Sequence, residues 1–276
     1  MLVEAIDYIK RFSGKVFVIK LGGETLLLKE VVESVAQDLI LLNTLGIRTV
    51  IVHGGGTEIS KAMEAFGKKP TFVSGLRVTD KETVDIVEMV LTGKVNQQLV
   101  MTIHKMGGQA VGLSGKSGCL FEAKKQCGKV DLGFVGDIKK CNPKIITTQL
   151  EGGFIPVISP IAFDKDGNSM NINADTAAAQ LAASLSASKL ILLTNVTGVL
   201  GKDKKKIKRL TMAEAKKLMT AGTIKGGMIP KVKACMDAIK AGVDRAHIVG
   251  ASHHAVLEEI LTKRGIGTMI TAKKVK

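Results

Sequence analysis

Short apolar runs alternate with longer amphipathic stretches along this chain. The short runs are rich in Val, Ile and Leu and are bounded by glycine, proline or polar residues, which is typical of buried β-strands. We predict strands at residues 16–21, 49–53, 109–113, 154–160, 189–196, 245–249 and 267–270.

The longer stretches place apolar residues at helical spacing. We predict helices at residues 28–46, 58–67, 79–93, 174–185, 211–222, 228–242 and 253–265. Two of them begin with the pattern of a capping box, Thr79 with Glu82 and Thr211 with Glu214. Gly46 is expected to end the first helix, and a glycine at position 93 is expected to end the third.

The alternation of strands and helices predicts βα units around a mainly parallel sheet. The expected fold class is therefore α/β, a three-layer αβα sandwich. Residues 118–143 interrupt the rhythm with short alternating runs and glycine turns, which predicts a β-hairpin insert that could cover a site. Because no linker divides the chain, we expect residues 1–276 to form a single domain.

The net charge of +15 raises the question of a polyanionic partner. Aromatic residues make up only 3% of the chain and Trp is absent, so stacking platforms for nucleic acid are not expected. Much of the charge lies in GKDKKKIKR (201–209) and in the C-terminal AKKVK, which we interpret as a solvated loop and tail. Small anionic substrates, or simply a basic surface, remain as explanations.

The sequence predicts a cytoplasmic protein without membrane contact. No apolar run reaches about 18 residues, and the amphipathic N-terminal residues do not resemble a secretory signal. In a reducing compartment Cys119, Cys127, Cys141 and Cys235 are expected to be free thiols, although a disulfide among the first three stays open. No cysteine or histidine spacing predicts structural zinc.

Glycines follow two predicted strands, in IKLGGE (Gly22 and Gly23) and in VIVHGGGTEI (Gly54, Gly55 and Gly56). Bare backbone amides at the start of a helix can bind phosphate or carboxylate. A tight turn is the alternative, but three glycines exceed what a turn needs. If ligands lie against this triplet, Gly55→Val should abolish activity in a protein that still folds.

Other glycine-rich fingerprints fail in this sequence. No GxGxxG follows the first strand, which argues against a common dinucleotide fold. AVGLSGKS (110–117) ends like a P-loop but has Ala110 in place of the first glycine. HGGG also occurs in lipases, yet this chain has no GxSxG.

Charged residues mark three further junctions. Lys20 lies in an apolar strand, where a lysine is costly unless its ammonium reaches an anion or solvent. Asp175 begins a helix, and it can be read as an N-cap or as a functional carboxylate. Lys231 follows Gly226 and Gly227 near a helix start, where a cation opposes the helix dipole unless phosphate binds there.

Two polar residues complete the candidate site. Arg77 in GLRVTD could hold a carboxylate, although a lone arginine is more often a surface residue. Asn171 lies in MNINAD just before Asp175. Two lysines, an aspartate and bare amides suit phosphoryl transfer, which depends on positioning and charge neutralisation. A carboxylic acid substrate is its own nucleophile, so no His or Ser is required.

In this order, the motifs resemble those of the amino acid kinase family. They are IKLGGE, VIVHGGG, GLRVTD, PVISPIAF, NINADTAAAQLA, LILLTNVTGVL and KGGMIPKV, and they span residues 16–270. The resemblance implies an open, mainly parallel eight-stranded sheet between helical layers. It also implies an N-terminal lobe (1–188) that binds the acyl amino acid and forms a dimer, and a C-terminal lobe (189–276) that binds ATP with Mg²⁺.

GLRVTD and NINAD favour members that phosphorylate the side-chain carboxylate of N-acetyl-L-glutamate in arginine biosynthesis, over the carbamate, UMP and aspartate kinases. A kinase of carrier-protein-linked aminoadipate or glutamate ranks second. A non-catalytic sensor of arginine or nucleotide is a third reading, which leaves Lys20, Asp175 and Lys231 without a purpose.

The resemblance also implies roles for individual residues. Lys20 and Lys231 would stabilise the transferring phosphoryl group, and Asp175 would organise them. Arg77 and Asn171 would bind the substrate's α-carboxylate and neighbouring groups. The remaining expected contacts are amides for substrate and phosphate from Gly55, Gly56, Gly22 and Gly23, and a nucleotide or phosphate site at Thr194, Asn195, Gly198, Gly226 and Gly227.

No protein ligand of Mg²⁺ is assigned. Asn195 is a departure, because the family commonly has Asp there. The N-terminal EAIDYIKRFSGK and the C-terminal EEILTKRGIGTMI resemble arginine-inhibited members, whereas GASHH departs from their pattern. We therefore expect a homo-oligomer, a hexamer inhibited by arginine, with an unregulated dimer as the alternative.

Overall fold

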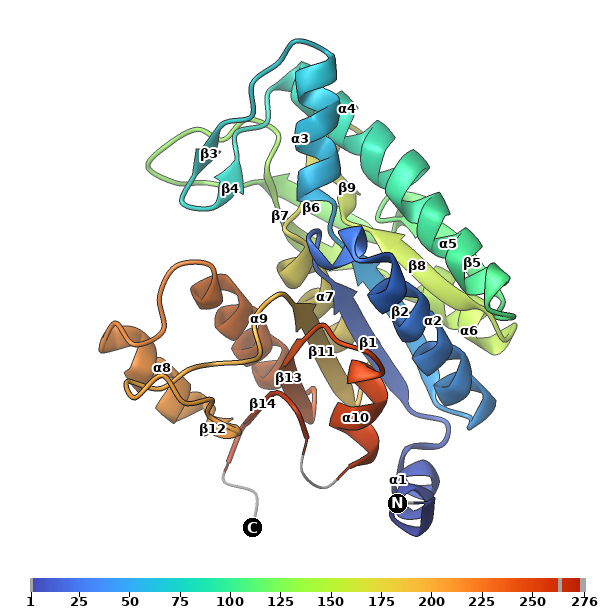
Figure 1. Ribbon diagram of the computed structural model, residues 1–276. Helices are drawn as coiled ribbons and strands as arrows, with labels where there is room; N and C mark the ends of the chain where they lie inside the picture. Colours follow the sequence, from blue (N-terminus) through green and yellow to red (C-terminus); the bar gives the residue numbers. More distant parts are fainter. Residues whose placement is uncertain (1, 263–264, 274–276) are drawn as a thin grey trace.

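An eight-stranded sheet forms the centre of the computed structural model, which describes residues 2–262 and 265–273 (Figure 1). Its strand order is β12-β14-β13-β11-β1-β2-β8-β5, and all neighbouring pairs are parallel except β13 with β14. The predicted α/β fold with a mainly parallel eight-stranded sheet is confirmed. The strands are β1 (Val16–Leu21), β2 (Arg48–His53), β5 (Ala110–Ser114), β8 (Ile155–Ser159), β11 (Lys189–Thr194), β12 (Arg209–Thr211), β13 (Arg245–Gly250) and β14 (Thr268–Thr271).

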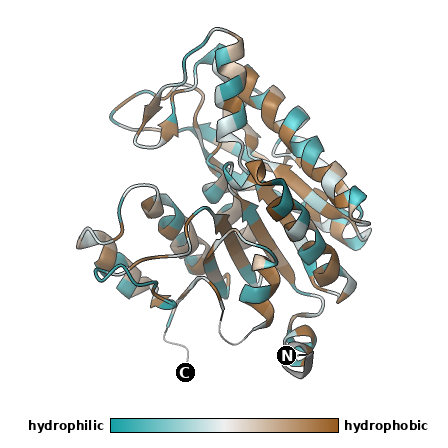
Figure 2. Cartoon of the chain, viewed as in Figure 1, coloured by the Kyte–Doolittle hydropathy of each residue, from teal (hydrophilic) through white to brown (hydrophobic). Residues whose placement is uncertain are grey.

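Helices cover both faces of this sheet, because successive side chains of a strand point to opposite sides. Val18 of β1 belongs to the core beneath α7 and α9, whereas the adjacent Ile19 packs in the core beneath α2, α5 and α10. Figure 2 shows these central strands as predominantly hydrophobic. The α-helices are α1 (Leu2–Phe12), α2 (Lys29–Thr44), α3 (Gly56–Ala65), α4 (Lys81–Glu88), α5 (Asn96–Lys105), α6 (Lys144–Glu151), α7 (Ala174–Ser184), α8 (Met212–Thr220), α9 (Met228–Lys240) and α10 (Ala255–Leu261).

The predicted hairpin insert is present as part of a second sheet. Strands β6 (Phe121–Lys125) and β7 (Gly136–Cys141) pair antiparallel, and β9 (Ile161–Phe163) and β10 (Ser169–Asn171) extend the sheet in the order β10-β9-β6-β7. A separate small hairpin consists of β3 (Phe72–Val73) and β4 (Leu76–Arg77). The short elements β9, β10 and α6 were not predicted, because they lack a long periodic pattern.

The predicted helix at residues 79–93 is wrong in both its cap and its end. Asp80 is the N-cap and accepts a hydrogen bond from Thr83 N, whereas the Thr79 hydroxyl accepts from Asn171 Nδ2 and donates to Arg77 O. Gly93 does not stop the helix. It lies in a π-helical segment, η2 (Met89–Val95), through which the chain continues directly into α5. The second predicted capping box, Thr211 with Glu214, is confirmed.

Other sequence predictions have mixed outcomes. All four cysteines are free, so the disulfide left open among the first three does not form. The lysine-rich loop at 201–209 is largely exposed, as predicted.

Helix α10 is shorter than the predicted 253–265, and residues 263–264 and 274–276 lie outside the described residues. None of the described helices is both long and apolar enough to cross a membrane.

Candidate active site

Two lysines share one buried aspartate at the carboxyl edge of the central strands. Lys20 Nζ lies 2.8 Å from Asp175 Oδ1, and Lys231 Nζ lies 2.9 Å from Asp175 Oδ2. The three residues come from β1, α7 and α9, which are far apart in sequence. Lys20 is only 6% exposed and Asp175 only 4%, so each charge depends on its partner for stabilisation. The prediction that the Lys20 ammonium reaches an anion is confirmed.

Burial and neighbouring opposite charges shift the pKa values of Asp175 and Lys20 in opposite directions. Burial raises the pKa of the Asp175 carboxyl, but the charges of Lys20 and Lys231 outweigh it and hold the pKa below the ordinary value. Burial lowers the pKa of the Lys20 ammonium, and the Asp175 carboxylate opposes that effect. Asp175 is therefore ionised and holds both ammonium groups in place.

Asp175 does not cap its helix. The N-cap of α7 is Asn173, whose side-chain oxygen accepts hydrogen bonds from the amides of Asp175 and Thr176. The N-cap reading of Asp175 is therefore wrong, and the functional reading fits its contacts. With the cap supplied two residues earlier, the Asp175 side chain is free to bind the lysines.

A cleft of about 810 Å³ lies above these lysines. That volume is typical of a site for small organic ligands. Eight of the residues singled out in the sequence line it, namely Lys20, Gly22, Gly23, Gly56, Thr194, Asn195, Gly227 and Lys231. Residues from β1, α3, β11 and α9 thus meet in one hollow.

The glycine loops after β1 and β2 touch each other through their backbones. A Cβ at Gly23 would lie 3.0 Å from Gly56 N and 3.3 Å from Gly55 N, so a side chain at Gly23 would push the loops apart. The Gly22 amide donates a hydrogen bond to Leu193 O at 3.2 Å. The first amides of α3 have no intrahelical partner, and they lie beside the cleft.

The two glycines that end the triplet differ in their surroundings. A Cβ at Gly55 would lie 2.5 Å from Leu91 Cδ2, inside the packing of α3 against η2. A Cβ at Gly56 would meet no protein atom within 4 Å. A side chain at Gly55 would require the Leu91 side chain to move, so the expectation that Gly55→Val spares folding stays a prediction, and Gly56 is the glycine that lines the cleft.

Arg77 is buried, not a surface arginine. Its guanidinium donates hydrogen bonds to Gly56 O at 2.8 Å and Ser60 Oγ at 2.9 Å, and it lies 4.6 Å from the centre of the Phe72 ring. Ser60 and Phe72 both line the cleft. The contacts place Arg77 beside the wall of the cleft, and they fix its orientation.

Asn171 is connected to Arg77 through Thr79. Asn171 Nδ2 donates to Thr79 Oγ1 at 3.2 Å, and that hydroxyl donates to Arg77 O at 2.7 Å.

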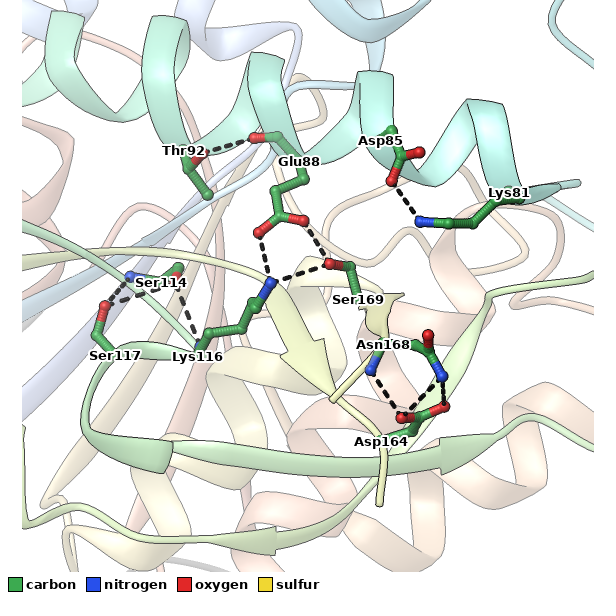
Figure 3. Close-up of polar contacts among 10 residues, drawn as sticks. All are labelled: Lys81, Asp85, Glu88, Thr92, Ser114, Lys116, Ser117, Asp164, Asn168 and Ser169. Carbon is green, nitrogen blue, oxygen red and sulfur yellow. Dashed lines mark hydrogen bonds and ion pairs between the residues drawn. The ribbon is translucent and has the colours of Figure 1, made fainter. Parts of the chain in front are cut away.

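A second network holds the other end of β10. Lys116 Nζ contacts Glu88 Oε1 at 2.9 Å and Ser169 Oγ at 3.1 Å, and Ser169 also donates to Glu88 (Figure 3). The strand that carries Asn171 is therefore held against α4.

Comparison with known proteins identifies the family. The model of the amino acid kinase family matches residues 15–250. The chain belongs to the amino acid kinase family.

Relatives within this family match the whole chain. An acetylglutamate kinase from Halothermothrix orenii is 50% identical over 280 residues, covering 99% of this chain and 97% of the relative. An acetylglutamate kinase from Archaeoglobus fulgidus is also 50% identical, with 98% of each chain covered.

Solved structures agree with the amino acid kinase fold. N-acetylglutamate synthase from Neisseria gonorrhoeae, complexed with coenzyme A and N-acetyl-glutamate, matches with a TM-score of 0.87 and 28% identity. The match covers 99% of this chain but only 63% of the synthase. Carbamate kinase from Giardia lamblia bound to AMP-PNP has a TM-score of 0.67 at 17% identity, and so shares the fold.

Some predicted residues of this amino acid kinase lie outside the cleft. Gly198 has a φ of +143°, and a Cβ there would lie 2.7 Å from Thr268 Oγ1, so packing accounts for it. Gly226 has a φ of +56° and does not line the cleft, whereas the adjacent Gly227 does. Their roles in nucleotide binding stay predictions.

The sequence reading also missed cleft residues. Glu24, Ser60, Phe72 and Lys225 line the cleft but were not singled out. Glu24 and Lys225 stand directly beside the glycine motifs, so their positions carried a signal. Ser60 and Phe72 gave none, because they reach the cleft only through the folding of α3 and the β3–β4 hairpin.

Proposed function

We propose that this protein transfers the γ-phosphoryl group of ATP to the side-chain carboxylate of N-acetyl-L-glutamate, giving N-acetyl-L-glutamyl 5-phosphate and ADP. The observation that carries the proposal is the pair of ammonium groups on Asp175, at the base of a cleft bordered by two glycine loops. The 50% identity to acetylglutamate kinases along nearly the whole chain supports the choice of acceptor.

The lysines fit the charge that develops in the reaction. A carboxylate oxygen of the acceptor attacks the γ-phosphorus while the bond to the β–γ bridging oxygen breaks, so negative charge spreads over the phosphoryl oxygens. Lys20 and Lys231 would neutralise those oxygens from fixed positions. Asp175 takes no proton, because its carboxylate is ionised and committed to the two lysines.

The acceptor and the nucleotide would occupy opposite sides of the lysines. Arg77 and Asn171 would bind the α-carboxylate and neighbouring groups of the acceptor, and the amides of Gly23, Gly55 and Gly56 would lie against its reacting end. Thr194, Asn195 and Gly227 line the part of the cleft that we assign to ATP. Positioning both substrates in this way removes much of the entropic cost of their encounter.

Mg²⁺ fits the chemistry of the cleft, because Glu24 offers the hard carboxylate oxygens that Mg²⁺ prefers. This residue would hold the ion together with the nucleotide phosphates. An ion held there would supply positive charge that neutralises the phosphate oxygens.

A hydroxylamine-trapping assay tests the reaction directly, because an acyl phosphate yields a hydroxamate. We expect product with ATP, Mg²⁺ and N-acetyl-L-glutamate. Product only with a carrier-linked aminoadipate or glutamate would favour the second kinase. Binding of nucleotide or arginine with no turnover of any acidic amino acid would favour the sensor.

Regulation by arginine and assembly into a hexamer are part of the same proposal. An N. gonorrhoeae synthase complexed with coenzyme A and L-arginine matches 99% of this chain with a TM-score of 0.80 and 27% identity, and this chain spans 65% of it. Here the N-terminal α1 packs through Phe12 against Phe17 of β1, with ring centres 5.2 Å apart. A sedimenting dimer whose activity is unchanged by millimolar arginine would contradict both points.

A further inference from the structure

The cleft contains one carboxylate that the lysines do not use. Its charged lining residues are Lys20, Glu24, Lys225 and Lys231, so Glu24 is the single acidic side chain among the described residues that line it. Asp175 lies deeper, and each of its oxygens is bound to a lysine. A cation that entered with a nucleotide would therefore find its protein carboxylate at Glu24.

A chain of hydrogen bonds orients this carboxylate. Thr194, which is buried at the end of β11, donates from Oγ1 to Asn195 Oδ1 at 3.2 Å. Asn195 in turn donates from Nδ2 to Glu24 Oε2. Because β1 and β11 are parallel neighbours, the residues that follow them meet at the same edge of the sheet. Such supporting contacts fix the direction of a metal ligand.

We infer that Glu24 is the protein's carboxylate ligand for the divalent cation that accompanies the nucleotide, and that Asn195 positions it. The inference rests on the proposed function. Mg²⁺ is usually held by one or two carboxylates together with substrate phosphates. Among the described residues no group of three or more His, Cys, Asp or Glu side chains could hold a metal by itself. A single oriented carboxylate at the mouth of the cleft suits that mode of binding.

The pairing also gives a reason for an amide side chain, in place of a carboxylate, at position 195. A carboxylate there would stand against the carboxylate of Glu24, and the two like charges would repel each other. The amide donates a hydrogen bond to Glu24 instead. The segments that follow β1 and β11 therefore hold one negative charge between them. Glu24, which follows β1, carries it.

Calorimetric titration of the whole protein with ADP, in Mg²⁺ and separately in EDTA, tests the inference without relying on turnover. For Glu24→Gln we expect the Kd of Mg·ADP to rise about 10-fold. The Kd of metal-free ADP should stay the same or fall about twofold, because a negative charge near the phosphates is removed. A purely structural role would weaken both forms equally.

The reciprocal double variant Glu24→Gln/Asn195→Asp is the matched rescue. It restores an amide–carboxylate pair with reversed polarity, so it should recover most of the affinity for Mg·ADP. Glu64→Gln removes an exposed carboxylate of α3 and should change neither affinity. Glu24 is itself exposed, and unchanged thermal unfolding midpoints would show that the variants fold.

Three results would overturn the inference. They are equal changes in both affinities for Glu24→Gln, no change in either affinity, or no recovery in the double variant. Failure of the wild-type protein to bind ADP in either medium would instead overturn the proposed function, and this inference with it. Paramagnetic resonance of Mn²⁺ added with ADP gives an independent readout, because loss of a carboxylate ligand changes the spectrum of the bound ion.

Discussion

The guanidinium of Arg77 donates a 2.8 Å hydrogen bond to the carbonyl oxygen of Gly56. The residue expected to bind the α-carboxylate is thereby attached to the glycine that borders the reacting end of the cleft. The same guanidinium reaches Ser60 Oγ and lies 3.1 Å from Met63 Sδ, so α3 fixes it from three positions. This hydrogen bond therefore joins the two parts of the proposed acceptor site.

Arg77→Lys should raise the KM for N-acetyl-L-glutamate about 10- to 100-fold, corresponding to the loss of one charged hydrogen bond and of the planar fork. The KM for ATP should be nearly unchanged, because we assign the nucleotide to the other side of the lysines. Steady-state kinetics with each substrate varied will measure both constants. Arg48→Lys, at an exposed arginine, is the control. Equal effects on both KM values would argue against a role specific to the acceptor.

Lys231→Ala should lower kcat about 10²- to 10³-fold with little change in either KM, because its ammonium is needed most when charge develops on the phosphoryl group. The matched control is Lys233→Ala, which removes an exposed lysine from the same helix. Single-turnover measurements would separate the chemical step from product release. A Lys231→Ala enzyme with normal kcat would remove this lysine from the chemistry.

Gly56→Ala and Gly55→Ala should have different effects. The methyl group at position 56 meets no protein atom within 4 Å, so the free energy of unfolding should hold while kcat/KM falls, since the methyl enters the cleft. At position 55 it would lie 2.5 Å from Leu91 Cδ2 and should reduce stability by about 1–3 kcal/mol. Urea unfolding and kinetics on both variants will check this. The reverse pattern would show that the cleft wall is assigned to the wrong glycine.

Stability should fall at mildly acidic pH because of His53. This fully buried ring contacts Gly54 O through Nδ1 at 2.8 Å and Asn96 Nδ2 through Nε2 at 3.2 Å, which suits the neutral form. Burial lowers its pKa from 6.5 to about 4. The unfolded chain therefore takes up the proton first, so stability present above pH 6.5 is lost as the pH falls toward 4.

Between pH 7 and pH 5 this histidine should account for a loss of about 2 kcal/mol in the free energy of unfolding. Urea titrations at both pH values will measure the loss, and His53→Gln should reduce it. The exposed His253 offers the control, since His253→Gln should leave the pH dependence unchanged. The same slope in the wild type and in His53→Gln would show that other groups are responsible.

The sequence correctly predicted the elements whose pattern lies within a few consecutive residues. The central strands are continuous apolar runs, and the Thr211 capping box is read from four consecutive residues. The Thr79 capping box failed because Asp80 supplies the cap, while the Thr79 hydroxyl accepts from the distant Asn171 Nδ2 and donates to Arg77 O. Gly93 was misread because the π-helical turn absorbs it without ending the helix.

The candidate site likewise contains residues that the local sequence identifies and supporting contacts that it does not. Lys20 and Lys231 were identified because each is costly where it stands, and Asp175 because it begins a helix after two Asn residues; the structure brings the three together. The supports of Asn171 were not identified, because Thr79 and the Glu88–Lys116 pair are separated from β10 by dozens of residues. Partners of that kind become visible only when the chain is folded.

The backbone contact at Gly23 restricts how such an enzyme can diverge. Since this loop lies against the backbone at Gly55 and Gly56, a side chain at Gly23 would displace that backbone, whereas a Cβ at Gly56 would meet no atom of the Gly23 loop. Variation in the proposed acceptor site would therefore spare Gly23. It can instead act at the rim, where Ser60 and Phe72 present replaceable side chains to the cleft.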